Sequence, residues 1–189
     1  MVSPSSPSEA RLQRRAHVLE AARALVGYET DELFDPVHTE LCAIDVVMVA
    51  GSPWLKDGLK RDYSRDQSGY RKLGGGGNSP NKAYFYRSNR NLIHYLKRAG
   101  FYIPRGGHPP PVPGMACFLD GEDSGRFNFS PGRSGIVLDV RQGRISRVVL
   151  AHANEPTQGQ AKRIIQVKSV VVRSGSEIDR CLIGYSDLP

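Results

Sequence analysis

The first part of the chain carries an apolar stripe with the spacing of a helix. Apolar residues recur there at intervals of three and four positions, namely at Leu12, Ala16, Leu19, Ala22 and Val26. Ser6 and Glu9 have the spacing of a capping box, and Pro7 stands between them at the first helical position. The stripe ends just before Gly27. The pattern therefore predicts one helix between Ser6 and Gly27.

The second half of the chain predicts another helix followed by a sheet. The helix covers residues 88–99, because an apolar face there is followed by Lys97 and Arg98 in the last turn and by Gly100 as a stop. Segments rich in β-branched residues predict about five strands, at residues 115–120, 135–141, 147–152, 164–173 and 181–184. A turn at residues 141–144 joins two of them. N-terminal helices packed on a small antiparallel sheet belong to the α+β class.

Residues 51–87 show no hydrophobic period. The segment is polar and aromatic, and it contains four consecutive glycines at residues 74–77. We therefore expect a long surface loop inserted into the domain at about residues 51–87. The expected organisation is a flexible tail over residues 1–8 and a single domain over residues 9–189.

Length and composition support one globular domain. The chain has 189 residues, of which 39% are hydrophobic and 24% charged, which is typical of a folded domain and not of a disordered one. The longest apolar stretch, residues 43–51, contains Asp45 and has about half the length needed to cross a bilayer. We expect no membrane span. The N-terminal sequence has no apolar core after its charges, so no secretory signal is expected in the chain as given.

The net charge of +7 is concentrated in one region. Between residues 56 and 105 there are twelve Lys and Arg against three Asp and Glu, and tyrosines are interleaved with them. Such a region could hold an anionic polymer, either a nucleic acid or an acidic polymer of the bacterial envelope. The alternative is a solvated face of a long-looped domain.

Cys42 is the candidate nucleophile. It heads residues 42–50, an apolar segment that by propensity alone predicts a buried strand. A thiol at the start of a helix would be favoured as thiolate by the helix dipole, whereas a cysteine in an apolar run commonly acts only as a small hydrophobe. The three cysteines form no CxxC pair and no histidines have the spacing of a metal site, so neither metal nor cofactor is expected.

The order of several segments resembles that of a known superfamily. These segments are Cys42-Ala-Ile-Asp-Val-Val, residues 87–100, Pro113-Gly-Met-Ala-Cys-Phe, Gly135-Ile-Val-Leu-Asp and Ile183-Gly-Tyr. Together they resemble the NlpC-like branch of the papain-like cysteine hydrolases, most closely an uncharacterised bacterial amidase-like family within it, from about residue 27 to the end. The resemblance implies a papain-like fold of the NlpC type, in which Cys42 begins a helix and acts as nucleophile.

The sequence departs from the family at the position of its histidine. The family places the base two residues before Gly-Ile-Val, and here that position is Arg133, which stays protonated and cannot accept a proton. One interpretation takes His152 as the imidazole, with Asn154 as a polar neighbour and Arg133 stabilising the thiolate. A second takes His38, in the loop before Cys42. A third is a domain of the same fold that binds without catalysis.

The resemblance implies a cysteine peptidase or amidase acting on peptides or peptidoglycan, and a location in the cell envelope or periplasm. We expect the basic aromatic segment to flank the groove, with Trp54, Tyr84, Tyr86 and Arg87 contacting substrate. The alternatives are a catalytically degenerate binding domain and a basic nucleic-acid-binding module, whose affinity for nucleic acid would fall steeply with salt.

Overall fold

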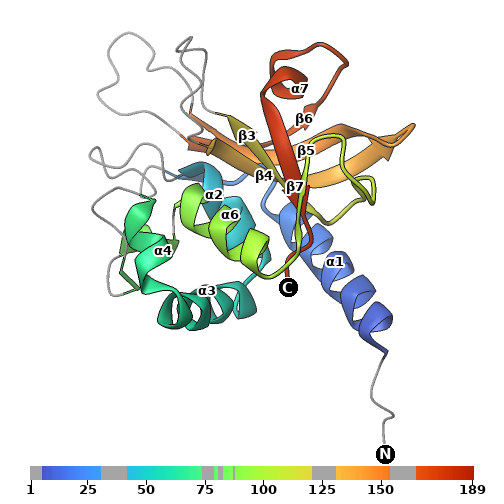
Figure 1. Cartoon of the computed structure of the whole chain (residues 1–189). Coiled ribbons are helices and arrows are strands. Elements are labelled where there is room, and N and C mark those ends of the chain that lie inside the picture. Colours follow the sequence, from blue (N-terminus) through green and yellow to red (C-terminus); the bar gives the residue numbers. More distant parts are fainter. Residues whose placement is uncertain are drawn as a thin grey trace, which may run out of the picture.

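The computed structural model describes residues 6–30, 42–73, 79–80, 83–86, 88–120, 131–153 and 165–189. An antiparallel sheet with the strand order β1-β6-β5-β4-β3-β7-β2 forms its centre (Figure 1). The strands are β1 (Glu29–Thr30), β2 (Tyr102–Pro104), β3 (Ala116–Asp120), β4 (Pro131–Arg141), β5 (Arg144–Ala153), β6 (Ile165–Val171) and β7 (Leu182–Ser186). The helices are α1 (Pro7–Ala24), α2 (Cys42–Ala50), α3 (Trp54–Arg65), α4 (Gln67–Lys72), α5 (Ala83–Tyr86), α6 (Asn89–Arg98) and α7 (Glu177–Cys181). The α+β class is confirmed.

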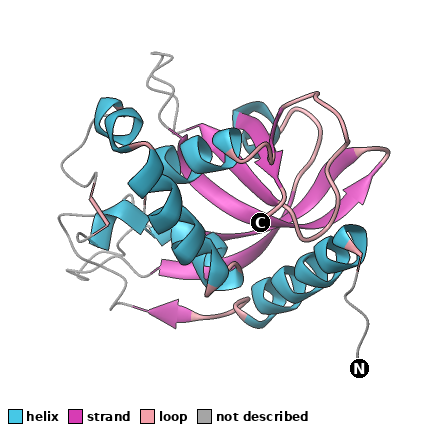
Figure 2. Ribbon diagram, turned by 60° about the horizontal axis from the view of Figure 1, so that its bottom comes forward, coloured by secondary structure: helices cyan, strands magenta, loops and turns pink. Residues whose placement is uncertain are grey.

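The sheet has a helical layer on one face and a thinner cover on the other. The helices α1, α2 and α6 lie on one side, and α7 lies on the opposite side (Figures 1 and 2). The main core lies between these helices and the sheet, where Phe118, Ile136 and Val149 are fully buried. A second cluster, with Cys117, Val148 and Tyr185, lies on the α7 face. Alternate residues of each strand therefore serve two separate cores.

The predicted strands correspond to β3 through β7, and the predicted turn joins β4 to β5 through Gln142 and Gly143. Both turn residues have positive φ, 52° and 73°, as a two-residue hairpin turn requires. The edge strands β1 and β2 were not predicted. They span two and three residues, which is too short to show an alternating pattern.

The capping box at the start of α1 is confirmed. The Glu9 amide donates to Ser6 Oγ at 3.2 Å, and the Ser6 amide donates to Glu9 Oε2 at 2.7 Å. The helix begins at Pro7, so the boundary predicted at residue 8 between tail and domain lies inside its first turn. The predicted apolar stripe is buried only in part: Ala22 is fully buried, whereas Val26 is 42% exposed. Leu12 is 61% exposed, because the first half of α1 extends beyond the sheet (Figure 1).

The loop predicted over residues 51–87 is wrong for most of the described residues, which form α3, α4 and α5. Their few apolar side chains face the main core, and four of them have no exposed area: Leu55, Leu59, Tyr70 and Phe85. Gly58 allows α3 to pack closely against Tyr95 of α6, because a Cβ at this position would lie 2.3 Å from the Tyr95 hydroxyl oxygen. The glycines at residues 74–77 lie outside the described residues.

The helix predicted over residues 88–99 is confirmed as α6. Its N-cap is Ser88, whose hydroxyl accepts from the Asn91 amide at 3.4 Å, and Gly100 follows its end with a φ of 75°. Leu92, Leu96 and Ile93 are buried against the sheet and α3. Within the described parts of the chain, no helix is both long and apolar enough to cross a membrane.

Candidate functional site

Residues 42–50 form the helix α2, which begins at Cys42 and lies against β4 and β5. Val46, Val47 and Ala50 are almost completely buried, whereas Val49 is 52% exposed. Strand propensity is overridden here because a helix that is apolar on most sides is stable when it is packed between a sheet and another helix. The first turn of such a helix exposes amide groups that favour an anion.

The strands under α2 divide their residues between the two faces of the sheet. Ser134 and Ile136 of β4 are fully buried and are paired with Phe118 and Ala116, which belong to the main core. Because side chains alternate along a strand, the neighbouring Arg133 belongs to the opposite face. Ser134 therefore occupies the helix-facing position at this end of β4. This position of Ser134 was not predicted, because a single serine carries no pattern.

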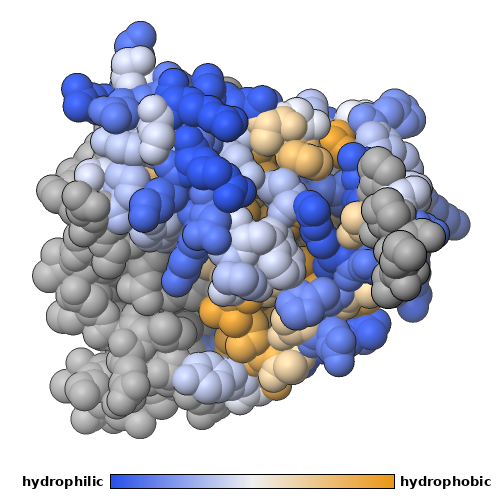
Figure 3. All heavy atoms as spheres, turned by 90° about the horizontal axis from the view of Figure 1, so that it is seen from below, coloured by the Kyte–Doolittle hydropathy of each residue, from blue (hydrophilic) through white to orange (hydrophobic). Residues whose placement is uncertain are grey.

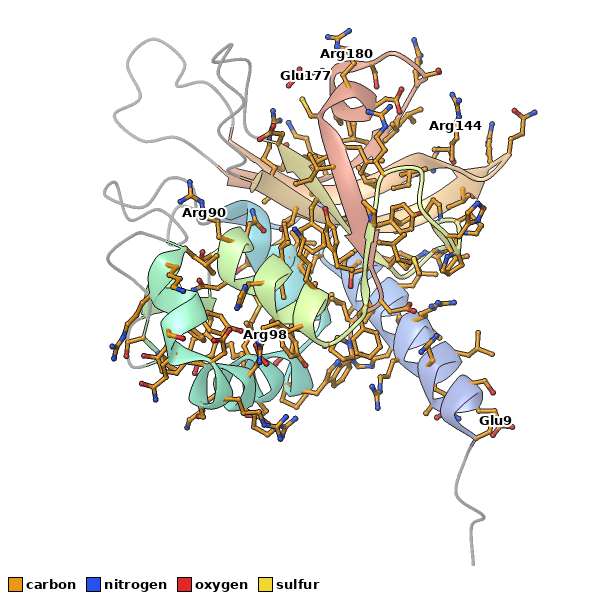
Figure 4. All side chains as sticks on the ribbon, in the orientation of Figure 1. Glu9, Arg90, Arg98, Arg144, Glu177 and Arg180 are labelled. Carbon is orange, nitrogen blue, oxygen red and sulfur yellow. The ribbon has the colours of Figure 1, made fainter. Side chains whose placement is uncertain are left out.

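Arg133 forms an ion pair on the α7 side of the sheet. Its Nη2 donates to Glu177 Oε1 at 2.9 Å, and its side chain is only 24% exposed. Figure 4 shows Glu177 above the sheet, on the side away from α2. The described contacts of Arg133 thus connect β4 to α7.

The glycine of the Gly-Ile-Val segment has a steric role. A Cβ on Gly135 would lie 2.4 Å from the carbonyl oxygen of Val149 in the neighbouring strand. Only glycine allows β4 and β5 to approach so closely at this point. This part of the motif is therefore explained by strand packing.

The remaining predicted catalytic residues are only partly described. His152 lies near the end of β5 and is paired with Gln166 of β6. The side chains of Cys42 and His152 lie outside the described part of the structure, as do Asn154 and His38 entirely. The pairing of Cys42 with either histidine stays a prediction.

Two of the four predicted substrate-binding residues can be located. The Trp54 ring lies 5.3 Å from the His17 ring of α1, and its buried Nε1 has no hydrogen-bond partner. Tyr86 packs edge-on against Phe85 at 5.2 Å, and burial raises the pKa of Tyr86. Both side chains are half-buried against the main core. The Tyr84 side chain and Arg87 lie outside the described residues.

The basic aromatic region is not an open stacking surface. Tyr70 and Phe85 are fully buried, and their rings lie 5.4 Å apart. The Tyr70 hydroxyl donates to Asp62 Oδ2 at 2.8 Å, and desolvation raises the pKa of Tyr70. These two rings cannot stack on a polymer, so that part of the prediction is wrong. The cationic part of the region remains accessible, because the basic side chains of α3 are exposed: Lys56, Lys60, Arg61 and Arg65.

The surface around α3 is correspondingly polar. Figure 3 views the molecule from below and shows hydrophilic areas with smaller apolar patches between them. A solvated charged face is one of the two interpretations that the sequence left open.

Asp66 and His94 link α4 to α6. His94 Nε2 lies 2.9 Å from Asp66 Oδ2, and the Asp66 carboxylate also caps α4 by accepting from the Gly69 amide at 3.1 Å. The hydrogen bond from His94, followed by that from Gly69, lowers the pKa of Asp66. The network is structural, since it joins helices that pack on the same core.

The lowered pKa of Asp66 predicts that the folded protein loses stability in acid. Its lowered pKa means that the ionised form stabilises the fold above the unfolded pKa of about 3.9, and that this stabilisation is lost as the pH falls through the folded pKa. We expect the wild-type free energy of unfolding to fall more steeply between about pH 5 and 3 than that of Asp66→Asn, which keeps the cap. Urea unfolding at several pH values measures this. An equal pH dependence of the free energy of unfolding in the two proteins would contradict this prediction.

The buried Cys117 thiol is not an activated nucleophile. Cys117 is fully buried in the second cluster, and burial raises the pKa of its thiol to about 12. Cys181 is half-buried at the end of α7 and is also free. Burial therefore excludes Cys117 as the nucleophile.

Among the residues that the structure describes, no group of three or more His, Cys, Asp or Glu side chains could hold a metal ion. Comparison of the chain with protein-family models, curated proteins and solved structures found no match.

Proposed function

We propose that the protein is a cysteine hydrolase that cleaves amide bonds in peptides or peptidoglycan, with Cys42 as its nucleophile. The position of α2 is the observation that supports this proposal most directly. A segment with the propensity of a strand forms instead a helix that begins at Cys42 and packs on antiparallel strands. That placement is what the resemblance to NlpC-like and other papain-like hydrolases implies, and it favours a thiolate at the amino end of the helix.

The chemistry requires an imidazole beside the thiol. A neutral histidine removes the thiol proton, the thiolate attacks the amide carbonyl, and the protonated imidazole then donates that proton to the leaving amine. In this proposal His152 is that histidine, with Asn154 as its polar neighbour, and His38 is the alternative. The ion pair between Arg133 and Glu177 supports a role for Arg133 in holding α7 to the sheet, in place of direct stabilisation of the thiolate.

The proposal predicts selective alkylation of Cys42. An ordinary thiol titrates near pH 8.5, and the Cys117 thiol in its buried site has a pKa of about 12. We expect iodoacetamide to modify Cys42 at pH 6–7 at a rate that falls only below its lowered pKa, while Cys117 stays unmodified in the folded protein. Peptide mass spectrometry separates the three sites. Cys181 is the internal control, because it is half-buried but distant in sequence from α2.

A reaction profile of Cys42 that matches that of Cys181 would contradict an activated nucleophile. In that case the second candidate, a binding domain without catalysis, becomes the better interpretation. Arg133 favours this candidate, because a residue that cannot act as a base occupies the family's histidine position and is already paired with Glu177. The exposed cations of α3 are the described surface on which such a domain would bind an acidic polymer, and its binding would weaken with added salt.

A further inference from the structure

Two adjoining hollows lie on the face of the sheet that carries α7. The first has a volume of about 310 Å³ and lies between residues 105–111, the β4–β5 turn and α7. This volume is at the lower end of the range for small-molecule pockets, about 300–1,000 Å³. Its floor is mostly apolar and consists of Cys117, Leu119, Val148, Ile178, Leu182 and Tyr185.

The second hollow is basic. It has a volume of about 450 Å³ and shares Arg144, Ile145, Val172 and Asp179 with the first, so the two hollows adjoin. Four arginines from three strand ends line it: Arg141, Arg144, Arg147 and Arg173. The only carboxylates among its lining residues are Asp139 and Asp179. The positive charge therefore exceeds the negative charge.

Contacts within the protein do not neutralise this excess. Arg141 and Arg144 are directly opposite each other across the hairpin turn, and like charges in that position destabilise a sheet. The hydrogen bond of Arg144 goes to the neutral Ser174 hydroxyl at 3.3 Å. Within the described ranges, neither Arg147 nor Arg173 forms an ion pair. An external anion would relieve this repulsion.

The nearby acidic groups are already engaged. Asp179 accepts from the Arg105 guanidinium at 3.3 Å and from the Gly175 amide at 2.8 Å. Asp139 accepts from the Val140 amide at 2.9 Å and lies 3.7 Å from Arg141 Nε. These contacts leave the other arginines of the hollow without a carboxylate partner.

Ser146 adds an unpaired polar group. Its Oγ is buried at the wall of the second hollow and has no hydrogen-bond partner. Buried hydroxyls normally have a partner, and a hydroxyl can donate to an anionic oxygen. The Ser146 hydroxyl is therefore a polar group beside the hollow whose hydrogen-bonding capacity is unused by the described residues.

We propose that this double hollow binds a small amphiphilic anion. Its phosphate or carboxylate group lies between Arg144 and Arg173, whose planar guanidinium groups pair with such oxygens in a bidentate manner. Its apolar body fills the first hollow over Val148 and Leu182. Figure 4 shows Arg144 extending from β5 on the side where α7 carries Glu177 and Arg180. The site is on the opposite face of the sheet from α2, so it is separate from the proposed hydrolase site.

Calorimetric titration with octyl phosphate, below its micelle concentration, tests the proposal. We expect saturable one-to-one binding, and affinities at least about tenfold weaker for inorganic phosphate alone and for 1-octanol alone, since each fills only one hollow. Competition by vesicles that contain phosphatidylglycerol would identify the source of the anion as a lipid headgroup, whereas its absence would indicate a free amphiphile. Octyl phosphate binding that does not saturate, or that equals phosphate binding, would overturn the proposal.

Variants locate the site. Arg144→Gln and Arg173→Gln are each expected to weaken octyl phosphate binding by about fivefold to tenfold, as for the loss of a charge-assisted hydrogen bond. Arg71→Gln is the matched control, because Arg71 is exposed on α4, in the helical layer on the other face of the sheet. Cys42→Ala should bind like the wild type, so this result does not depend on the hydrolase proposal. Equal losses in Arg71→Gln and Arg144→Gln would mean nonspecific charge attraction and would refute the site.

Discussion

Cys42→Ala is expected to lower the hydrolysis of purified sacculi or synthetic stem peptides by at least about a thousandfold. The reason is that alanine lacks the atom that forms the covalent intermediate, and removal of a nucleophile leaves only the residual effect of binding and polarisation. Mass spectrometry of the released peptides measures the rate and identifies the bond that is cleaved. The fold should be retained, because α2 is anchored by Val46, Val47 and Ala50 and not by its first residue alone.

Two histidine variants distinguish the candidate bases. His152→Ala is expected to reduce the rate nearly as much as Cys42→Ala, because the losses of rate caused by removing members of one catalytic unit are not additive. His38→Ala should have little effect. Cys181→Ala is the control for loss of a thiol elsewhere, and circular dichroism with thermal denaturation verifies that each variant folds. Hydrolysis by Cys42→Ala at the wild-type rate would disprove the nucleophile assignment. A reversed order of the two histidine variants would favour His38.

The parts of the fold that could be predicted are those specified by local signals. The capping box at Ser6 and Glu9, the stop at Gly100 and the hairpin turn at Gln142 and Gly143 each depend on backbone preferences of neighbouring residues. Such signals lie within a few positions of the chain. Strands β3 to β7 were predicted for the same reason, since an alternating or β-branched run is visible in the sequence.

The helices α3 and α4 were missed because their buried faces are narrow. Leu55 and Leu59 are the main apolar side chains of α3, and Tyr70 is the main one of α4. Tyrosine counts as polar in a hydropathy pattern, although its ring is apolar and its hydroxyl can be satisfied by a carboxylate such as Asp62. Two of the aromatic residues that indicated a polymer-binding surface, Tyr70 and Phe85, are for this reason part of the core.

The segments that form the candidate site could be predicted, but the contacts between their side chains could not. That Cys42 begins a helix was predicted by resemblance against local propensity, and the structure has that helix. The pairing of Arg133 with Glu177 joins residues 44 positions apart, and no sequence pattern specifies such a contact. The face on which Arg133 lies depends on strand register, which the sequence alone did not determine.

Asp187→Ala is expected to lower the free energy of unfolding by about 3 kcal/mol, the largest effect that we expect from a single polar group. Arg15 donates to the Asp187 carboxylate from Nε and, at 2.7 Å, from Nη2, and this contact between residues 172 positions apart joins α1 to the C-terminal segment. Asp187 is only 6% exposed, and the hydrogen bond with its carboxylate raises the pKa of Arg15. Removal of the carboxylate leaves a half-buried guanidinium without its partner, which costs more than the loss of an exposed pair.

Glu177→Gln is the contrast for this measurement. Glu177 also pairs with an arginine, but its side chain is 63% exposed, so the change should cost less than about 1 kcal/mol. Urea unfolding at neutral pH compares the two variants, and the double variant Arg15→Ala with Asp187→Ala should lose less than the sum of the single changes, because the residues are in contact. If Asp187→Ala and Glu177→Gln had equal small effects, solvent would be compensating the Arg15 guanidinium, and the anchoring of α1 would then depend on its apolar contacts, such as those of Val18 and Ala22.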